Sequence, residues 1–178
     1  MKLIETGLAD LWVLKPDVLA DRRGCFVKTY HANLFTELDL PFTPRESYFS
    51  VSAQGVVRGM HFQLPPAAQA KLVYCIAGRV LDVVLDLRRT SASRGQAFAR
   101  ELSAAHRELL FIPIGFAHGF LALEDGSTMV YQTSTVHSPP HDTGIRWDSF
   151  GFRWPVSDPI LSERDGRFPA WSDFSSPF

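Results

Sequence analysis

Five side chains with acid–base chemistry lie in or beside segments that have the pattern of β-strands. They are His61, Lys71, His118, Tyr131 and Asp165. Together these groups can take a proton, give one and hold a developing negative oxygen, which suits removal of a proton from a carbon next to a carbonyl without a cofactor. A lone histidine in a strand is more often a packing or solvent-facing residue, so the combination carries the prediction.

The segment around His61 predicts how two functional groups are placed. Residues 56–63 alternate as a strand, which puts His61 and Arg58 on opposite faces. The Pro65–Pro66 pair ends this strand, because proline cannot donate to a ladder. Lys71 opens the next predicted strand. A hairpin that carries an arginine, an imidazole and a lysine is unusual for a purely structural core element.

Short segments with strand patterns follow one another along most of the chain, with little helix between them. The predicted strands are Leu11–Ala20, Phe26–Tyr30, Tyr48–Ala53, Val56–Gln63, Lys71–Ala77, Arg79–Arg88, Gln96–Leu102, Glu108–Ile112, His118–Leu123 and Ser127–Thr133. Only His31–Leu38 has the pattern of a helix. Strands this short, at near-regular spacing with Gly or Pro between them, indicate an all-β fold, a jelly-roll barrel with short peripheral helices.

A single domain is expected over residues 1–178. The barrel core is predicted at about 47–134, followed by an aromatic and proline-rich tail over 138–178. Three of the four tryptophans lie in that tail, so we expect it to pack on the barrel. No linker composition and no internal repeat suggests a second domain.

Charge and cysteine content narrow the possible partners and compartment. A formal net charge of −1 gives no overall attraction to nucleic acid or to a membrane surface. No apolar run approaches the roughly 20 residues of a membrane-spanning helix, and the N-terminus lacks the pattern of a signal peptide. Cys25 and Cys75 have no metal-ligand spacing. We therefore expect a cytoplasmic protein with two free thiols.

Pro113–His118 fits the second sequence motif of cupins, a turn that delivers a histidine into a jelly-roll barrel. In metal cupins the first motif supplies a His-x-His pair and a later glutamate. Here that pair reads His61-Phe62-Gln63, and no glutamate follows at suitable spacing. Two histidines without a third ligand make a poor transition-metal site, so a cupin-type barrel without metal is favoured. Phosphate loops, dinucleotide motifs and nucleophile elbows are absent.

The order of motifs along the chain resembles the dTDP-4-dehydrorhamnose 3,5-epimerase family over about Lys2 to Asp165. The motifs that carry the resemblance are residues 21–26 (DRRGCF), 55–63 (GVVRGMHFQ), 69–73 (QAKLV), 82–88 (DVVLDLR), 112–120 and 161–165 (LSERD). The resemblance implies a dimeric, metal-free and cofactor-free cupin that acts on a nucleotide-linked 4-keto-6-deoxyhexose in deoxysugar biosynthesis. Such an enzyme removes the proton at C3, at C5 or at both, and returns it on the opposite face.

The same resemblance assigns roles to the catalytic candidates. His61 would be the base, held by Asp165, and Tyr131 would donate the proton from the other face. Lys71 would stabilise the enolate oxygen. The residues assigned to substrate binding are Arg23, Phe26, Lys28, Glu46, Tyr48, Arg58, Gln63, His118, His137, Asp142 and Arg164. Among these, the two arginines Arg23 and Arg58 would hold the diphosphate.

Departures from the family pattern cluster where the nucleobase would bind. The changed positions are Lys28, Glu46-Ser47-Tyr48, His137, Asp142 and Arg164, where the family usually has Glu, Gln-x-Asn, Tyr, Glu and Lys. Glu46 could accept a hydrogen bond from the exocyclic amino group of cytosine, which thymine lacks. The sequence therefore leaves two nucleotides open, a dTDP-sugar and a CDP-sugar.

Two other classes of function also remain open. One is a metal-dependent cupin, an isomerase or a dioxygenase, that uses His61 and His118. The other is a non-catalytic module that binds sugar nucleotides. The joint presence of His61, Tyr131 and Asp165 favours an enzyme over a binding module, since binding alone needs no acid–base set.

Overall fold

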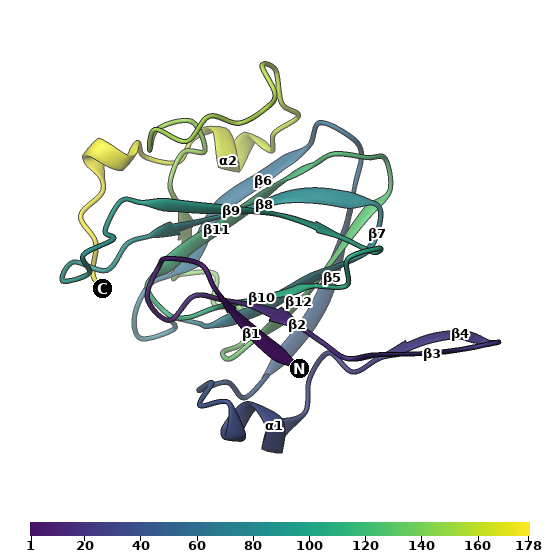
Figure 1. Ribbon diagram of the computed structural model, residues 1–178. Helices are drawn as coiled ribbons and strands as arrows, with labels where there is room; N and C mark the ends of the chain where they lie inside the picture. The colour runs from purple at the N-terminus through teal and green to yellow at the C-terminus, as the bar shows by residue number, and fades with distance from the viewer.

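In the computed structural model, which describes residues 1–178, two antiparallel sheets face each other across an apolar interior (Figure 1). The larger sheet has the strand order β1 (Lys2–Glu5), β2 (Trp12–Lys15), β10 (Leu109–Ile112), β7 (Lys71–Ala77), β12 (Ser127–Thr133), β5 (Glu46–Ser52). The smaller sheet has the order β13 (Asp142–Gly144), β6 (Val57–Gln63), β11 (Phe116–Ala122), β8 (Arg79–Asp86), β9 (Ala97–Ser103). The prediction of an all-β jelly-roll barrel is confirmed.

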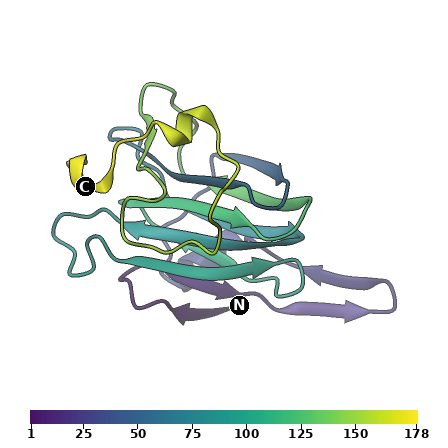
Figure 2. The same cartoon turned by 90° about the horizontal axis from the view of Figure 1, so that it is seen from above.

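Two elements lie outside the sheets at the N-terminal end. The hairpin of β3 (Val18–Asp21) and β4 (Gly24–Val27) extends away from the barrel in both views (Figures 1 and 2). Helix α1 (Ala32–Glu37) packs its Phe35 into an apolar cluster on the outer side of the larger sheet. The predicted helix His31–Leu38 thus matches α1 to within a residue at each end, whereas the predicted strand Leu11–Ala20 divides into β2 and β3.

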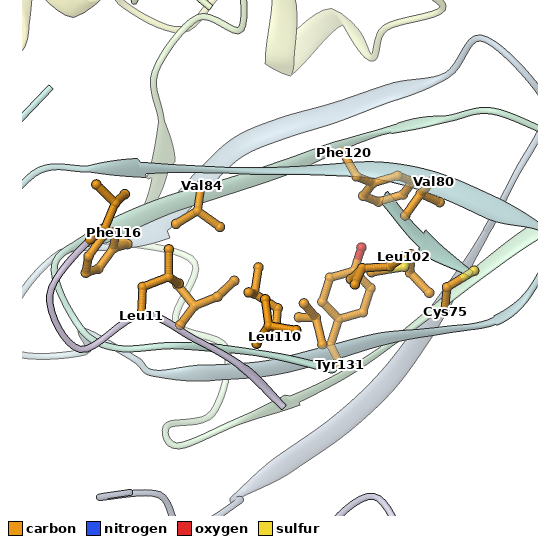
Figure 3. Packing of buried hydrophobic residues seen from close by; sticks show 14 of the residues in the cluster. Leu11, Cys75, Val80, Val84, Leu102, Leu110, Phe116, Phe120 and Tyr131 are labelled. Atoms are coloured by element: carbon orange, nitrogen blue, oxygen red, sulfur yellow. The ribbon is translucent and has the colours of Figure 1, made fainter. Parts of the chain in front are cut away.

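The core between the sheets comes from alternate residues of the facing strands. Figure 3 shows Val84 and Phe120 of the smaller sheet above Leu110 and Tyr131 of the larger one. All four side chains are buried. Because side chains alternate along β8, Val84 points into this interior, whereas its neighbours Val83 and Leu85 point to the other face of the smaller sheet.

The C-terminal segment covers that opposite face of the smaller sheet. Ile145, Phe150 and Trp154 are buried there against a second apolar cluster, and the ring of Phe174 lies 5.3 Å from that of Phe62. The segment contains two short helices, α2 (Glu163–Gly166) and the 3₁₀ turn η1 (Trp171–Asp173). The sequence patterns predicted neither of these two helices. No helix of the chain is long and apolar enough to cross a membrane.

A bulge in β6 overturns the predicted placement of Arg58. His61 pairs with His118 and Arg58 with Phe120, so a single residue of β11, Gly119, faces two residues of β6. This extra residue reverses the alternation, and Arg58 and His61 therefore point to the same side instead of opposite sides. The bulge requires glycine, because a Cβ on Gly119 would lie 2.7 Å from the carbonyl oxygen of Arg58.

Candidate active site

A cavity of about 380 Å³ opens between the two sheets and collects most of the predicted site residues. The smaller sheet contributes side chains from β6 and β11, and the larger sheet contributes side chains from β5, β7 and β12. The lining residues are Glu46, Tyr48, Ser50, Arg58, His61, Gln69, Lys71, His118, Phe120, Tyr131, His137, Asp142 and Arg164. Asp165 lies directly behind His61.

His61 and Asp165 form a hydrogen-bonded pair, although 104 residues separate them in sequence. The imidazole Nε2 lies 2.8 Å from Asp165 Oδ1, and the second carboxylate oxygen accepts the N–H of Gly59 at 3.1 Å. Ser162 caps α2 by accepting the N–H of Asp165, which fixes the position of the carboxylate. His61 Nδ1 makes no hydrogen bond within the chain, so it is free to accept a proton.

Burial governs the protonation of this pair. It lowers the pKa of the His61 imidazole below its usual value, although Asp165 acts in the opposite direction. Burial also tends to raise the pKa of Asp165, but the hydrogen bond and charge of His61 outweigh it and leave that pKa lowered. The resting pair is therefore a neutral imidazole that donates its Nε2–H to a carboxylate, the state a general base requires.

Lys71, the first residue of β7, is a buried cation on the cavity wall. Its Nζ donates to the carbonyl oxygen of His61 at 3.1 Å, and the residue is only 6% exposed. Burial lowers the pKa of Lys71 to about 8, while Asp142 and Asp82 act against that shift. The ammonium is thus mostly charged at neutral pH and can stabilise a negative oxygen next to His61.

Tyr131 faces the cavity from β12, on the sheet opposite His61. Its ring stacks on that of Tyr48, with centroids 4.8 Å apart, and its hydroxyl lies 3.4 Å from Ser50 Oγ. Figure 3 shows the hydroxyl directed across the barrel, towards the smaller sheet. Burial raises the pKa of Tyr131 well above its usual value, so the phenol keeps its proton at neutral pH and can act as a donor.

A second histidine–carboxylate pair lies deeper in the barrel. Nε2 of His118 is 2.9 and 3.0 Å from the two oxygens of Asp82, and both residues are buried. Burial raises the pKa of Asp82, against the opposing effects of His118 and Lys71. Asp82 was not predicted as a site residue. The sequence did contain a signal for it, because Asp82 is a carboxylate on the same face of the clearly predicted strand as Val80 and Val84.

Polar side chains at the mouth of the cavity hold one another in place. The carboxylate of Asp142 accepts a hydrogen bond from Arg164 and lies 3.3 Å from the imidazole Nε2 of His137. Glu46 Oε2 accepts the N–H of His137 at 2.7 Å. Arg58 donates from Nε to Ser52 at 3.0 Å. Positive and negative groups therefore alternate around this opening.

These residues do not form a metal site. No group of three or more His, Cys, Asp or Glu side chains is close enough to hold a metal ion. His61 and His118, which a metal cupin would use, each direct Nε2 to a carboxylate. The donor set of the metal-cupin alternative is therefore missing from this chain.

Comparison with known proteins places this geometry in a family. Residues 5–173 match the sequence model of the family described as dTDP-4-dehydrorhamnose 3,5-epimerase. The chain belongs to this family. It is 39% identical over 170 residues to the dTDP-4-dehydrorhamnose 3,5-epimerase of Shigella flexneri, covering 93% of each chain.

Two solved structures of the family superpose closely on the chain. The dTDP-4-dehydrorhamnose 3,5-epimerase of Bacillus anthracis, with TDP and PPi bound, has a TM-score of 0.92 at 36% identity and covers 95% of this chain and 98% of its own. The dTDP-6-deoxy-D-glucose-3,5-epimerase of Legionella pneumophila, in complex with dTDP-4-keto-L-rhamnose, has a TM-score of 0.91 at 31% identity. It covers 98% of this chain and 94% of its own.

Four residues expected at the substrate from the epimerase resemblance lie elsewhere in this chain. Arg23, Phe26 and Lys28 belong to the β3–β4 hairpin or directly follow it, away from the cavity; Arg23 pairs with Asp21. Gln63 is not among the lining residues either, so its role in substrate binding stays a prediction. Its buried amide accepts the N–H of Ser138 at 2.6 Å and donates to two carbonyl oxygens, so it fixes the loop that carries His137.

Three lining residues were not among the predicted site residues: Ser50, Gln69 and Phe120. Gln69 and Phe120 lie within segments that carried the resemblance, but nothing in their type distinguished them. Ser50 lies in the Ser-x-Ser strand that follows Glu46-Ser47-Tyr48, but its residue type gave no chemical signal, because a serine in a strand is chemically ordinary until its neighbours are known. Its contact with Tyr131 depends on the pairing of β5 with β12.

Proposed function

We propose that this protein is an epimerase of a nucleotide-linked 4-keto-6-deoxyhexose, of the dTDP-4-keto-6-deoxyglucose type. One observation carries the proposal. A neutral histidine base and a protonated tyrosine face one cavity from opposite sheets, with a buried lysine beside the histidine. A binding module would need none of these groups in these protonation states.

In the first step His61 removes the proton from a carbon next to the C4 carbonyl. Nδ1 accepts this proton, because Nε2–H is directed to Asp165. The Asp165 carboxylate then stabilises the imidazolium. The electrons move onto the C4 oxygen, and the Lys71 ammonium stabilises the resulting enolate in its buried position.

In the second step Tyr131 gives its proton to the same carbon. Its place on the sheet opposite His61 supports delivery to the opposite face of the sugar, which inverts the centre. Its raised pKa keeps the phenol protonated until the enolate forms. The enolate carbon then takes this proton, because a carbon next to a carbonyl is a weaker acid than a phenol. All of these steps use side chains of the chain itself.

Thymidine is the nucleoside that the family relationship supports. The relative from Bacillus anthracis binds TDP, and the one from Legionella pneumophila binds a dTDP-sugar. The CDP-sugar alternative depended on a Glu46 carboxylate free to accept from cytosine, yet one of its oxygens already accepts the N–H of His137. Arg58 and Arg164 at the cavity are the guanidinium groups available to the diphosphate.

The active unit is proposed to be a homodimer. Strand β5 is an edge strand, and its outward residues Phe49 and Val51 are more than half exposed, at 66% and 54%. The projecting hairpin likewise exposes Leu19 and Phe26, at 66% and 59%. Exposed edges and apolar side chains of this kind are normally covered. If the β3–β4 hairpin of one chain lay across the β5 edge of a second chain, the apolar side chains of both the hairpin and the edge strand would be covered. The hairpin would also bring Arg23 to the cavity of the second chain.

One experiment tests the reaction and the nucleotide together. The protein is incubated in D₂O with the dTDP-linked and, separately, the CDP-linked 4-keto-6-deoxyglucose, and deuterium at C3 and C5 is counted. Inversion with deuterium at one or both carbons of the dTDP-sugar is expected, at a kcat/KM at least about tenfold above that for the CDP-sugar. Loss of all deuterium incorporation after treatment with EDTA would instead support a metal enzyme.

A further inference from the structure

Each inversion leaves the enzyme in a state that cannot repeat the reaction. His61 has gained the proton taken from carbon, and Tyr131 has lost the one it gave. The two groups lie on opposite sheets and make no hydrogen bond to each other, so the chain provides no direct path for a proton between them. The burial that keeps Tyr131 protonated also makes its phenolate unfavourable, and the next inversion requires that phenolate to be reprotonated from solvent.

His61 has an evident route for releasing its proton. Its side chain is 25% exposed and lines the main cavity. It also borders a second opening of about 270 Å³ between β6 and the α2 segment, which is lined by Arg58, Ser162 and Arg164 among others. Water can therefore reach the imidazole even when the main cavity is filled.

Tyr131 has no comparable access. It is 7% exposed, Tyr48 covers one face of its ring, and the His118 ring meets it edge-on at 6.0 Å. Nε2 of His118 is directed to Asp82 and does not approach the phenol. The hydroxyl makes one hydrogen bond in the chain, to Ser50 Oγ at 3.4 Å.

Ser50 is placed and equipped to pass a proton on. It lies on the edge strand β5, is half-buried and lines the cavity. Its hydroxyl makes no other hydrogen bond, so one lone pair and its proton remain available. Ser52 lies two residues further along the same face of β5. Its hydroxyl is less available, because it already accepts a hydrogen bond from Arg58 Nε.

We propose that Ser50 is a proton-relay residue that returns a solvent proton to Tyr131 after each inversion. The step balances: the Ser50 O–H proton moves to the phenolate oxygen while a water hydrogen-bonded to Ser50 Oγ gives it a proton. His61 releases its own proton to solvent in the same cycle, so the enzyme returns to its starting state. This inference rests on the proposed function, and it assigns the regeneration of the donor to a residue that is neither the base nor the donor.

The test separates the first inversion from later ones. Ser50→Ala, Ser50→Thr and a control at an exposed serine of the C-terminal segment, Ser157→Ala, are compared with wild type by rapid quench and in the steady state. Because Tyr131 begins protonated, Ser50→Ala should perform its first inversion within about twofold of the wild-type rate. Its steady-state kcat should then fall about tenfold with little change in KM. Ser50→Thr, which keeps the hydroxyl, and Ser157→Ala should both behave like wild type.

Two further measurements distinguish slow reprotonation from slow product release. In Ser50→Ala the solvent isotope effect on kcat should rise above the wild-type value, and added viscogen should leave kcat unchanged. Where the enzyme inverts two centres, singly inverted sugar should accumulate. If Ser50→Ala fails to fold by circular dichroism, Ser50→Val replaces it, since valine has the shape of the threonine in Ser50→Thr but carries no proton to relay.

Several outcomes would overturn the relay. These are an unchanged kcat in Ser50→Ala, a first inversion slowed as much as the steady state, or a burst whose later phase depends on viscosity. A wild-type protein that incorporates no deuterium would instead refute the proposed function itself. The two failures are therefore distinguishable.

Discussion

Arg58 and His61 face the same cavity although they lie three positions apart along one strand. Regular alternation would place them on opposite faces of the strand. The bulge opposite Gly119 adds one residue between them, and their side chains therefore point to the same face. The guanidinium group that we propose for the diphosphate and the imidazole that we propose as the base thereby lie on one face of β6. The active site depends on this irregularity as directly as on the two side chains.

The bulge should be sensitive to a single methyl group. In Gly119→Ala the new Cβ would lie 2.7 Å from the Arg58 carbonyl oxygen and 3.0 Å from Gly59 Cα, both in the backbone. We expect a loss of about 1–3 kcal/mol in the free energy of unfolding, measured with urea, together with reduced activity. Gly166→Ala is the control, because a Cβ there meets nothing within 4 Å. Equal stability of the two variants would contradict this account.

Replacing the base should abolish most of the turnover without unfolding the protein. His61→Asn is expected to lower kcat/KM by about 10²–10⁴, whereas His106→Asn at an exposed turn should have no effect. A base must be deprotonated, so wild-type activity should fall as the pH drops through the His61 pKa, which lies below its usual value of 6.5. Asp165→Asn removes a group that raises this pKa, so its midpoint should shift to lower pH while kcat falls.

Tyr131→Phe tests the donor, because it removes only a hydroxyl. Deuterium exchange into substrate should continue, since proton removal by His61 comes first, while formation of the inverted product should be lost. Stability should change little, because the hydroxyl makes only one hydrogen bond, at 3.4 Å. Nuclear magnetic resonance of the sugar protons measures exchange and inversion in one sample. Normal yields of inverted sugar from this variant would refute the role of Tyr131.

Lys71 should make the stability of the protein depend on alkaline pH. Its pKa is lowered to about 8 in the folded protein from 10.5, so the unfolded chain binds more protons between these values. Wild-type stability should therefore rise by about 3 kcal/mol, relative to Lys71→Met, as the pH increases through this window. Urea unfolding at pH values from 7 to above 10.5 measures the difference, with Lys15→Met at an exposed position as the control. Parallel pH profiles for wild type and Lys71→Met would contradict the burial of a titrating lysine.

The proposed exchange of hairpins predicts complementation between two defective chains. Arg23→Ala and His61→Asn should each be poorly active alone. When the two are mixed, unfolded and refolded together, the heterodimer should regain one intact cavity, with His61 from one chain and Arg23 from the other. Sedimentation should show a dimer at micromolar concentration. A fully active monomer, or no recovery in the mixture despite heterodimer formation, would rule out this arrangement.

Local sequence patterns predicted the strands well, because alternation and Gly or Pro boundaries act over a few residues. Lys71–Ala77 and Ser127–Thr133 were predicted with the bounds that the structure has. The short strand β13 and helix α2 were missed. Three or four residues carry too little periodicity to be recognised, and both elements depend on contacts with the barrel.

The sequence by itself determined the barrel and, through the family motifs, predicted His61, Lys71, Tyr131 and Asp165 as the acid–base set. Only the tertiary structure decided what each of these groups contacts. The pairing of His118 with Asp82 and the contact of Tyr131 with Ser50 follow from which strands are neighbours and in what register. Register is set by hydrogen bonds between segments far apart in the chain, so a bulge or a one-residue shift changes every side-chain neighbour while leaving the local pattern unchanged.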